Sequence, residues 1–231
     1  MLVYGKNVVV EILKNKTLIH KVYLFNNFSD DYIVSEIQKR KIETIIMDKL
    51  QLDHLANGNH QGIIVSIPDY EYFELDDFIN ADDALVVILD HLEDPHNFGA
   101  IIRTCEAAGV NGIIIPKDRS VDVNSTVMKV SAGALENMKI AIVTNLTSTI
   151  KDLQKKGFWV VGTDMEGTNY TEIDYKGKTV IVIGSEGEGM SRLVKESCDF
   201  IAKIPMRGKI NSLNASVATG IIVFEAAKLR K

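Results

Sequence analysis

The sequence predicts an α/β protein with two domains. Two observations predict the class: short apolar runs typical of buried strands recur along the chain, and segments with the helical spacing of apolar residues separate them. A third observation predicts the division, because an acidic stretch interrupts this pattern near residue 70. The length of 231 residues is enough for one large domain or two small ones.

The first predicted domain covers residues 1–68 and alternates helices with strands. The helices are expected over Asn7–Lys14, Ile33–Arg40 and Lys49–Ala56. The strands are expected over Lys21–Phe25, Ile42–Met47 and Gly62–Ile67, the last of which ends before Pro68. This alternation indicates a small α/β sandwich.

The acidic stretch from residue 69 to residue 83 is predicted to be a solvated linker. It contains seven Asp or Glu residues and no Lys or Arg, while the whole chain has a net charge of −5, so the remainder carries +2. The acidic balance argues against a wholly basic nucleic-acid binder. It does not exclude a local basic surface, because charge can be concentrated on one face.

The second predicted domain covers residues 84–231. Its strands are expected over Leu85–Leu89, Gly112–Ile115, Ile140–Val143, Phe158–Val161, Thr179–Ile183 and Phe200–Ile204. Its helices are expected over Asn97–Gly109, Ser125–Leu135, Leu146–Lys156, Ser191–Glu196 and Leu213–Arg230. Apolar strands joined by helices predict a mostly parallel sheet that helices cover on both faces.

The last predicted helix is apolar nearly all round, since Glu225 is the only charged residue between Val217 and Ala227. Such a helix must be buried on more than one side. It is therefore either central to the fold or packed against a partner chain, and we favour a partner.

Several features favour a cytoplasmic protein. No run of about 18 apolar residues could span a membrane, and the first residues lack the layout of a signal peptide. Cys105 and Cys198 lie in apolar-periodic segments, which is typical of small buried side chains. The polar residues near His91 lack a fixed ligand spacing, so no metal site is predicted.

Three segments could carry chemistry, although each also has a simpler explanation. Asp94 and Pro95 form a good helix start, and Arg103, on the helix that follows, could simply pair with Glu106 in solvent. The glycine-rich segment Gly184–Met190 follows a strand, where glycine allows close backbone approach, but a plain turn is the alternative. Its spacing is neither that of a dinucleotide-binding loop nor that of a P-loop, so an oxidoreductase is disfavoured.

The third segment, Asn211–Ser216, could serve only as a helix cap, although two Asn and two Ser exceed what a cap requires.

Together and in this order, the three segments resemble the SpoU (TrmH-like) branch of the SPOUT RNA methyltransferases. The resemblance rests on Asn97–Arg103, Ile183–Ser191 and Asn211–Ala218. It extends to the N-terminus, where Tyr4–Glu11 and His60–Gly62 resemble the ends of the substrate-binding domain in RlmB-like rRNA enzymes. Nearly the whole chain is covered.

The resemblance implies a C-terminal α/β trefoil-knot domain and a small N-terminal α/β ribosomal-protein-like domain that binds RNA. It also implies S-adenosylmethionine as cofactor. The backbone around Gly184, Ile204 and Leu213 would hold the adenine and ribose of the cofactor, with Thr163 and Met206 nearby.

The implied reaction is methylation of a ribose 2′-hydroxyl. Arg103 would be the base or would position the hydroxyl, and positioning is the easier role because arginine stays protonated. The residues that would fix this arginine and the RNA backbone are Asn97, Glu186, Ser212 and Asn214.

The implied assembly is a homodimer whose site uses both chains, which agrees with the apolar last helix. The expected substrate is a guanosine of 23S rRNA. A tRNA methyltransferase and a non-catalytic RNA-binding or ribosome-assembly factor are the alternatives.

Overall fold

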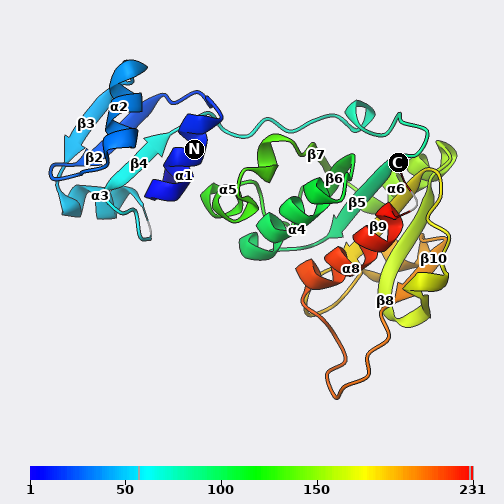
Figure 1. Cartoon of the computed structure of the whole chain (residues 1–231). Coiled ribbons are helices and arrows are strands. Elements are labelled where there is room, and N and C mark those ends of the chain that lie inside the picture. Colours follow the sequence, from blue (N-terminus) through cyan, green and yellow to red (C-terminus); the bar gives the residue numbers. More distant parts are fainter. Residues whose placement is uncertain (57, 229, 231) are drawn as a thin grey trace. The chain divides into compact units, whose positions relative to one another are not determined.

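The computed structural model describes residues 1–56, 58–228 and 230 (Figure 1). The chain forms two compact units. The first contains residues 1–71 and 123–132, and the second contains residues 72–122 and 133–231. The division thus differs from the predicted one in the segment 123–132, which the sequence pattern placed in the second domain.

The first unit is built on a mixed four-stranded sheet in the order β1-β4-β2-β3. Its strands are β1 (Leu2–Tyr4), β2 (Lys21–Phe25), β3 (Thr44–Met47) and β4 (Ile63–Ser66). β2 and β3 are parallel, whereas β4 runs antiparallel to both of its neighbours. The predicted strands are present, and β1 is an additional strand that was too short to show an alternating pattern.

Among its described residues this unit has four helices, and three of them have side-chain caps. They are α1 (Lys6–Lys14), α2 (Asp31–Lys39), α3 (Lys49–Leu55) and α5 (Ser125–Ser131). Asp30 accepts from the backbone of Ile33 at 3.1 Å and starts α2. Asp48 and Gln51 form a reciprocal capping box that starts α3.

The predicted helix over Ser125–Leu135 is shorter than expected. α5 ends at Ser131 because Ala132 adopts a left-handed conformation with φ of 50°. Met128 on α5 packs against the apolar core of the first unit, which explains why this segment clusters there.

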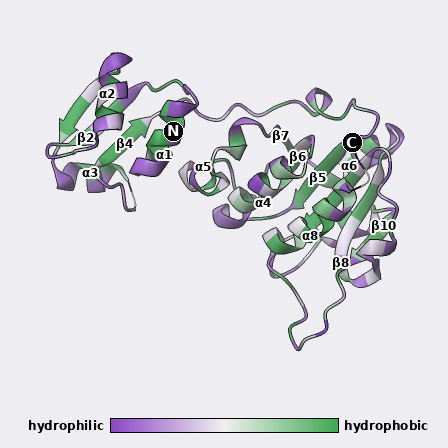
Figure 2. Cartoon of the chain, viewed as in Figure 1, coloured by the Kyte–Doolittle hydropathy of each residue, from purple (hydrophilic) through white to green (hydrophobic). Residues whose placement is uncertain are grey.

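The second unit is a parallel six-stranded sheet in the order β10-β8-β9-β5-β6-β7. Its strands are β5 (Leu85–Asp90), β6 (Gly112–Pro116), β7 (Ile140–Val143), β8 (Trp159–Asn169), β9 (Thr179–Gly184) and β10 (Phe200–Lys203). β5 and β9 are buried along their whole length, and the hydrophobic colouring of β5 is plain in Figure 2. The predicted parallel sheet is confirmed.

Helices cover both faces of this sheet. They are α4 (Pro95–Ala107), α6 (Leu146–Lys155), α7 (Arg192–Glu196) and α8 (Ala215–Ala227). α4 packs against α8, and α6 packs against α7. Val86 and Val180 share a core cluster with Ile150 of α6 and Val194 of α7. Side chains alternate between the two faces along a strand. The residues on either side of Val86 and Val180 therefore face the opposite side of the sheet, away from α6 and α7.

The acidic stretch is only in part the solvated linker that was predicted. Phe78 and Ile79 are buried in the core of the second unit, next to a short 3-10 helix, η1 (Leu75–Asp77). Gly112 lies directly beneath Phe78, where a Cβ atom would come within 2.3 Å of the ring. The sequence pattern did not indicate this buried contact, because the apolar residues among the acidic ones are too few to show the period of a helix or a strand.

β8 is much longer than the predicted strand over Phe158–Val161. Its second half is polar and pairs with β10 after a register shift between Ile201 and Ala202. Gly167 permits this pairing, because a Cβ atom there would lie 2.4 Å from the carbonyl oxygen of Ile201. A polar strand on an outer part of the sheet lacks the apolar run that sequence reasoning depends on.

α4 and α8 have 13 residues each and are the longest helices in the described part of the chain. α8 begins at Ala215, two residues later than predicted, because Asn214 caps it. Within the described part of the chain, no helix is both long and apolar enough to cross a membrane.

Candidate active site

The carboxyl ends of the parallel strands lie at one edge of the six-stranded sheet, and the three sequence motifs are attached there. The last residue of β5, Asp90, is opposite Gly184 at the end of β9. The first motif follows β5, the second follows β9, and the third lies between β10 and α8. In open parallel sheets, ligands bind at this edge.

Asn97 is the centre of a chain of three polar side chains, one from each motif. Its side-chain Nδ2 donates to Oε1 of Glu186, and its Oδ1 accepts from Nδ2 of Asn214 at 2.8 Å. Oδ1 of Asn214 accepts in turn from the backbone of Ser216 at 2.9 Å and caps α8. Since Asn97 is buried, this network fixes both amides and connects three segments that are distant in sequence.

Arg103 lies on α4, six residues after Asn97, and its side chain is exposed. In the described part of the chain, it has no hydrogen bond or ion pair. The alternative partner, Glu106, instead accepts from Nδ2 of Asn137 at 3.3 Å. Ser212 is also exposed, in the segment before α8. The guanidinium of Arg103 is therefore free to contact a ligand.

Gly184 is required by the backbone of its own loop. A Cβ atom at this position would lie 2.2 Å from the carbonyl carbon of Gly189. The backbones of Ser185 and Gly189 form two mutual hydrogen bonds of 3.1 Å, and Gly189 has a φ of 68°. The second motif is thus a tight closed turn, and it presents Glu186 to Asn97.

The segment from residue 204 to residue 213, drawn in orange between β10 and α8 in Figure 1, extends from the sheet. Among the described residues, its backbone groups form no hydrogen bonds. Met206 and Ile210 are 38% and 72% exposed, while Ile204 and Leu213 at its ends are half-buried. Thr163 on β8 donates its hydroxyl to the carbonyl of Val182 at 3.0 Å, so this side chain is held against β9.

A second polar cluster at the same edge was not predicted. Asp90 is fully buried and accepts from the backbone of Ser191 at 2.6 Å and from Nδ1 of His91 at 2.5 Å. Nε2 of His91 lies 3.3 Å from a guanidinium nitrogen of Arg119. The residues around His91 drew attention in the sequence only as metal ligands, and no group of three or more such ligands could hold a metal within the described residues.

Both cysteines are structural. Burial raises the pKa of the Cys105 thiol far above its usual range, and burial together with the nearby carboxylates of Asp199 and Asp90 raises that of Cys198 to about 12. A thiol at such a pKa is a poor nucleophile at neutral pH.

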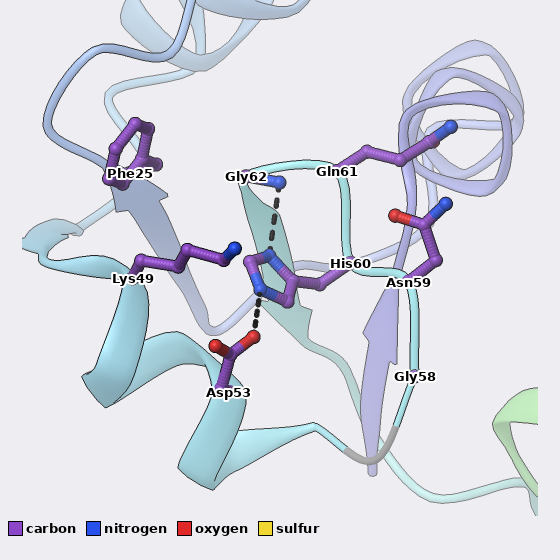
Figure 3. Close-up of a pocket in the computed structure, with 8 residues that line it drawn as sticks. All are labelled: Phe25, Lys49, Asp53, Gly58, Asn59, His60, Gln61 and Gly62. Carbon is purple, nitrogen blue, oxygen red and sulfur yellow. Dashed lines mark hydrogen bonds and ion pairs between the residues drawn. The ribbon is translucent and has the colours of Figure 1, made fainter.

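The first unit contains a separate pocket of about 260 Å³, shown in Figure 3. His60 lines this pocket. Its Nε2 lies 2.9 Å from Oδ1 of Asp53, and its Nδ1 accepts from the backbone of Gly62 at 3.0 Å. The Lys49 side chain extends toward this imidazole (Figure 3). The lining residues are Phe25, Lys49, Asp53, Gly58, Asn59, His60, Gln61 and Gly62. The pocket thus combines an aromatic ring, a cation and amide groups.

Family models match both units. Residues 84–224 match the SpoU rRNA methylase family, and residues 2–73 match a domain described as RNA 2′-O ribose methyltransferase substrate binding. The first match includes all three motifs, and the second includes the pocket around His60.

Individual proteins agree with these models. A protein of Bacillus subtilis, YacO, whose name assigns it to the TrmH family of tRNA/rRNA methyltransferases, is 42% identical over 99% of this chain and 95% of its own length. The AdoMet-bound rRNA methyltransferase from Sinorhizobium meliloti is 26% identical, with a TM-score of 0.80 over 100% of this chain and 87% of that one.

The AdoMet complex of the SpoU methyltransferase AviRb from Streptomyces viridochromogenes has the same fold. It gives a TM-score of 0.81 at 24% identity, over 100% of this chain and 90% of that one. With both units matched by family models and a relative aligned over nearly its whole length, the chain belongs to the SpoU (TrmH-like) family of RNA methyltransferases.

Proposed function

We propose that the chain transfers the methyl group of S-adenosylmethionine to the 2′-hydroxyl of a ribose in RNA. The observation that carries this proposal is the network of Glu186, Asn97 and Asn214, which ties the three motifs together on the helix that presents Arg103. The network fits a reaction whose rate depends on the alignment of the reacting groups. Holding reactants in line can lower the activation barrier by up to roughly 7–11 kcal/mol. RNA follows from the reaction, because only ribose has a 2′-hydroxyl.

The segment after β10 fits the cofactor. Its backbone N–H and C=O groups, which have no hydrogen-bond partner among the described residues, can bind the polar edge of an adenine, and the exposed apolar surface of Met206 can cover the ring. We assign the backbone of Gly184, Ile204 and Leu213 to this role, with Thr163 alongside. We include in the proposal the trefoil knot that the family resemblance implies. When bound, the cofactor supplies an electrophilic methyl group.

Arg103 is proposed to orient the acceptor nucleotide. A guanidinium is always protonated and carries donors in a planar fork, so it binds phosphate more readily than it accepts a proton. It is also exposed and unpaired among the described residues. Asn97, Glu186, Ser212 and Asn214 are proposed to hold the RNA backbone and this arginine in place.

The active form is proposed to be a homodimer. α8 is apolar nearly all round, and its Val217 and Phe224 are 50% and 49% exposed. These residues are two turns apart on one side of the helix, so they form a stripe that a second copy of the chain can cover. This arrangement would bring a neighbouring chain close to α4, which packs against α8.

The substrate is proposed to be a guanosine of 23S rRNA, in the cytoplasm. The pocket around His60 supports a role of the first unit in RNA recognition, since Phe25 can stack on a base and Lys49 can bind a phosphate. A tRNA substrate is the competing assignment.

Mapping the methylated nucleotide tests the proposal. RNA from a strain that lacks the gene is digested and compared with wild-type RNA by mass spectrometry. Loss of one 2′-O-methylguanosine from 23S rRNA supports the full proposal, and loss of a modification from tRNA would redirect the substrate. If no RNA loses a methyl group and the purified chain does not bind S-adenosylmethionine, a non-catalytic RNA-binding factor would replace the enzyme.

A further inference from the structure

Asp90 couples two segments of the ligand edge through its two carboxylate oxygens. One oxygen accepts from the backbone of Ser191, immediately after the second motif, and the other faces Nδ1 of His91. The side chain is fully buried. A buried carboxylate needs partners at both oxygens, and here those partners are a loop and a histidine ring at the ligand edge.

The two hydrogen-bond partners of His91 indicate which of its ring nitrogens carries the proton. Arginine can only donate, so the 3.3 Å contact with Arg119 requires Nε2 of His91 to be the acceptor. Nδ1 then carries the proton and donates to Asp90. The three residues form an ordered series in which the carboxylate orients the imidazole and the imidazole orients the guanidinium.

Both His91 and Arg119 have left-handed backbone conformations, with φ of 58° and 51°. Such conformations are uncommon for residues other than glycine and concentrate at functional sites. The two residues follow the neighbouring strands β5 and β6 at their carboxyl ends. Two unusual backbone positions therefore bring these side chains together at the edge where ligands bind.

Arg119 is exposed, and in the described part of the chain no carboxylate lies within ion-pair distance of it. Lys155, by contrast, is an exposed cation that is paired, with Asp152 at 2.8 Å. The guanidinium of Arg119 thus contacts the imidazole of His91, and no carboxylate among the described residues pairs with its charge. An anionic ligand is the partner that this arrangement lacks.

We propose that Arg119 binds a phosphate of the RNA backbone, and that Asp90 and His91 are its positioning residues. The proposal rests on the proposed function for the source of the phosphate. It adds an anchoring point next to the strand ends and distinct from Arg103. Guanidinium–phosphate contacts position a nucleic acid without reading its sequence.

Binding of single-stranded poly(U) by the full-length protein tests the first part, because a phosphate contact is independent of sequence. Arg119→Ala is expected to weaken binding about tenfold and to lower the slope of log K against log salt by about 0.7. Lys155→Ala is the control: it also removes one exposed cation, but from the end of α6 just before β8 begins, at the opposite edge of the sheet. An Arg119→Ala protein with wild-type affinity and slope would overturn the proposal.

A double-mutant cycle tests the positioning residues. His91→Ala is expected to weaken poly(U) binding severalfold, and the double variant with Arg119→Ala is expected to bind like Arg119→Ala alone. Additive losses would show that His91 does not act through Arg119.

Steady-state methylation separates this proposal from the proposed function. Both variants are expected to raise KM for RNA while kcat changes by less than about twofold. A fall in kcat at saturating RNA with unchanged affinity would give His91 a role in the reaction itself and overturn the inference. If the wild-type protein transfers no methyl group, the proposed function fails, while the poly(U) result still decides on Arg119.

Discussion

Asn214 donates a 2.8 Å hydrogen bond to the side chain of Asn97 across 117 residues of sequence. The same asparagine caps α8, so one side chain both starts the last helix and closes the network of the candidate site. Stability and chemistry are therefore linked at this position, and substitutions can separate them.

Asn214→Ala and Asn214→Asp form the informative pair. Alanine removes the cap, which costs about 1 kcal/mol and lowers Tm by about 2–4 °C. Aspartate caps a helix as well as asparagine does, so its Tm is expected to remain near the wild-type value. Neither residue can donate to Oδ1 of Asn97, so both variants are expected to methylate about 10- to 100-fold more slowly. Full activity in the aspartate variant would show that the Asn97 contact is dispensable.

Arg103→Ala is expected to abolish detectable methyl transfer, with a loss of about 10²–10⁴-fold. The side chain is exposed and has no partner among the described residues, so stability should change by less than about 0.5 kcal/mol. Calorimetry should find cofactor affinity within about twofold of wild type. Arg103→Lys keeps the charge but loses the planar fork, so it should recover little activity. Near-normal methylation by Arg103→Ala would exclude the proposed role.

Gly184→Ala tests the closed turn of the second motif. The added methyl group would collide with the backbone of Gly189, and overpacking of this kind costs about 1–3 kcal/mol. The turn must open, so cofactor binding is expected to weaken as well. Gly187→Ala is the matched control in the same turn, because its Cβ atom would meet nothing within 4 Å. Equal thermal denaturation curves for the two variants would contradict this account.

The sequence predicted the fold of the second unit well because its strands carry a strong signal. The segments Leu85–Leu89 and Thr179–Ile183 are continuous apolar runs, and buried parallel strands require such runs. β8 was truncated in the prediction because its second half is polar. Phe78 was assigned to a linker because a single aromatic anchor between acidic residues has no period.

The site was predictable only in part. Helix and strand periodicity could place Asn97, Glu186 and Asn214 on separate elements, but not in one hydrogen-bonded chain, since that depends on strand order. The family resemblance grouped them. The contact between His91 and Arg119 depends on two left-handed backbone positions, and neither residue type signals such a conformation in a sequence. The sequence pattern predicted no metal site at these residues and gave them no other role, whereas in the structure His91 contacts both Asp90 and Arg119.

The exposed stripe on α8 gives the test of assembly. Phe224→Glu and Val217→Glu place a carboxylate on a half-exposed apolar surface, so each variant should fold normally and become monomeric in light scattering after gel filtration. Leu18→Glu is the control, because Leu18 is 62% exposed and belongs to the first unit. If the site uses both chains, the monomeric variants should lose methyl transfer and regain none at saturating RNA. A monomeric variant with full activity would show that one chain is sufficient, and a dimeric Phe224→Glu protein would place the interface elsewhere.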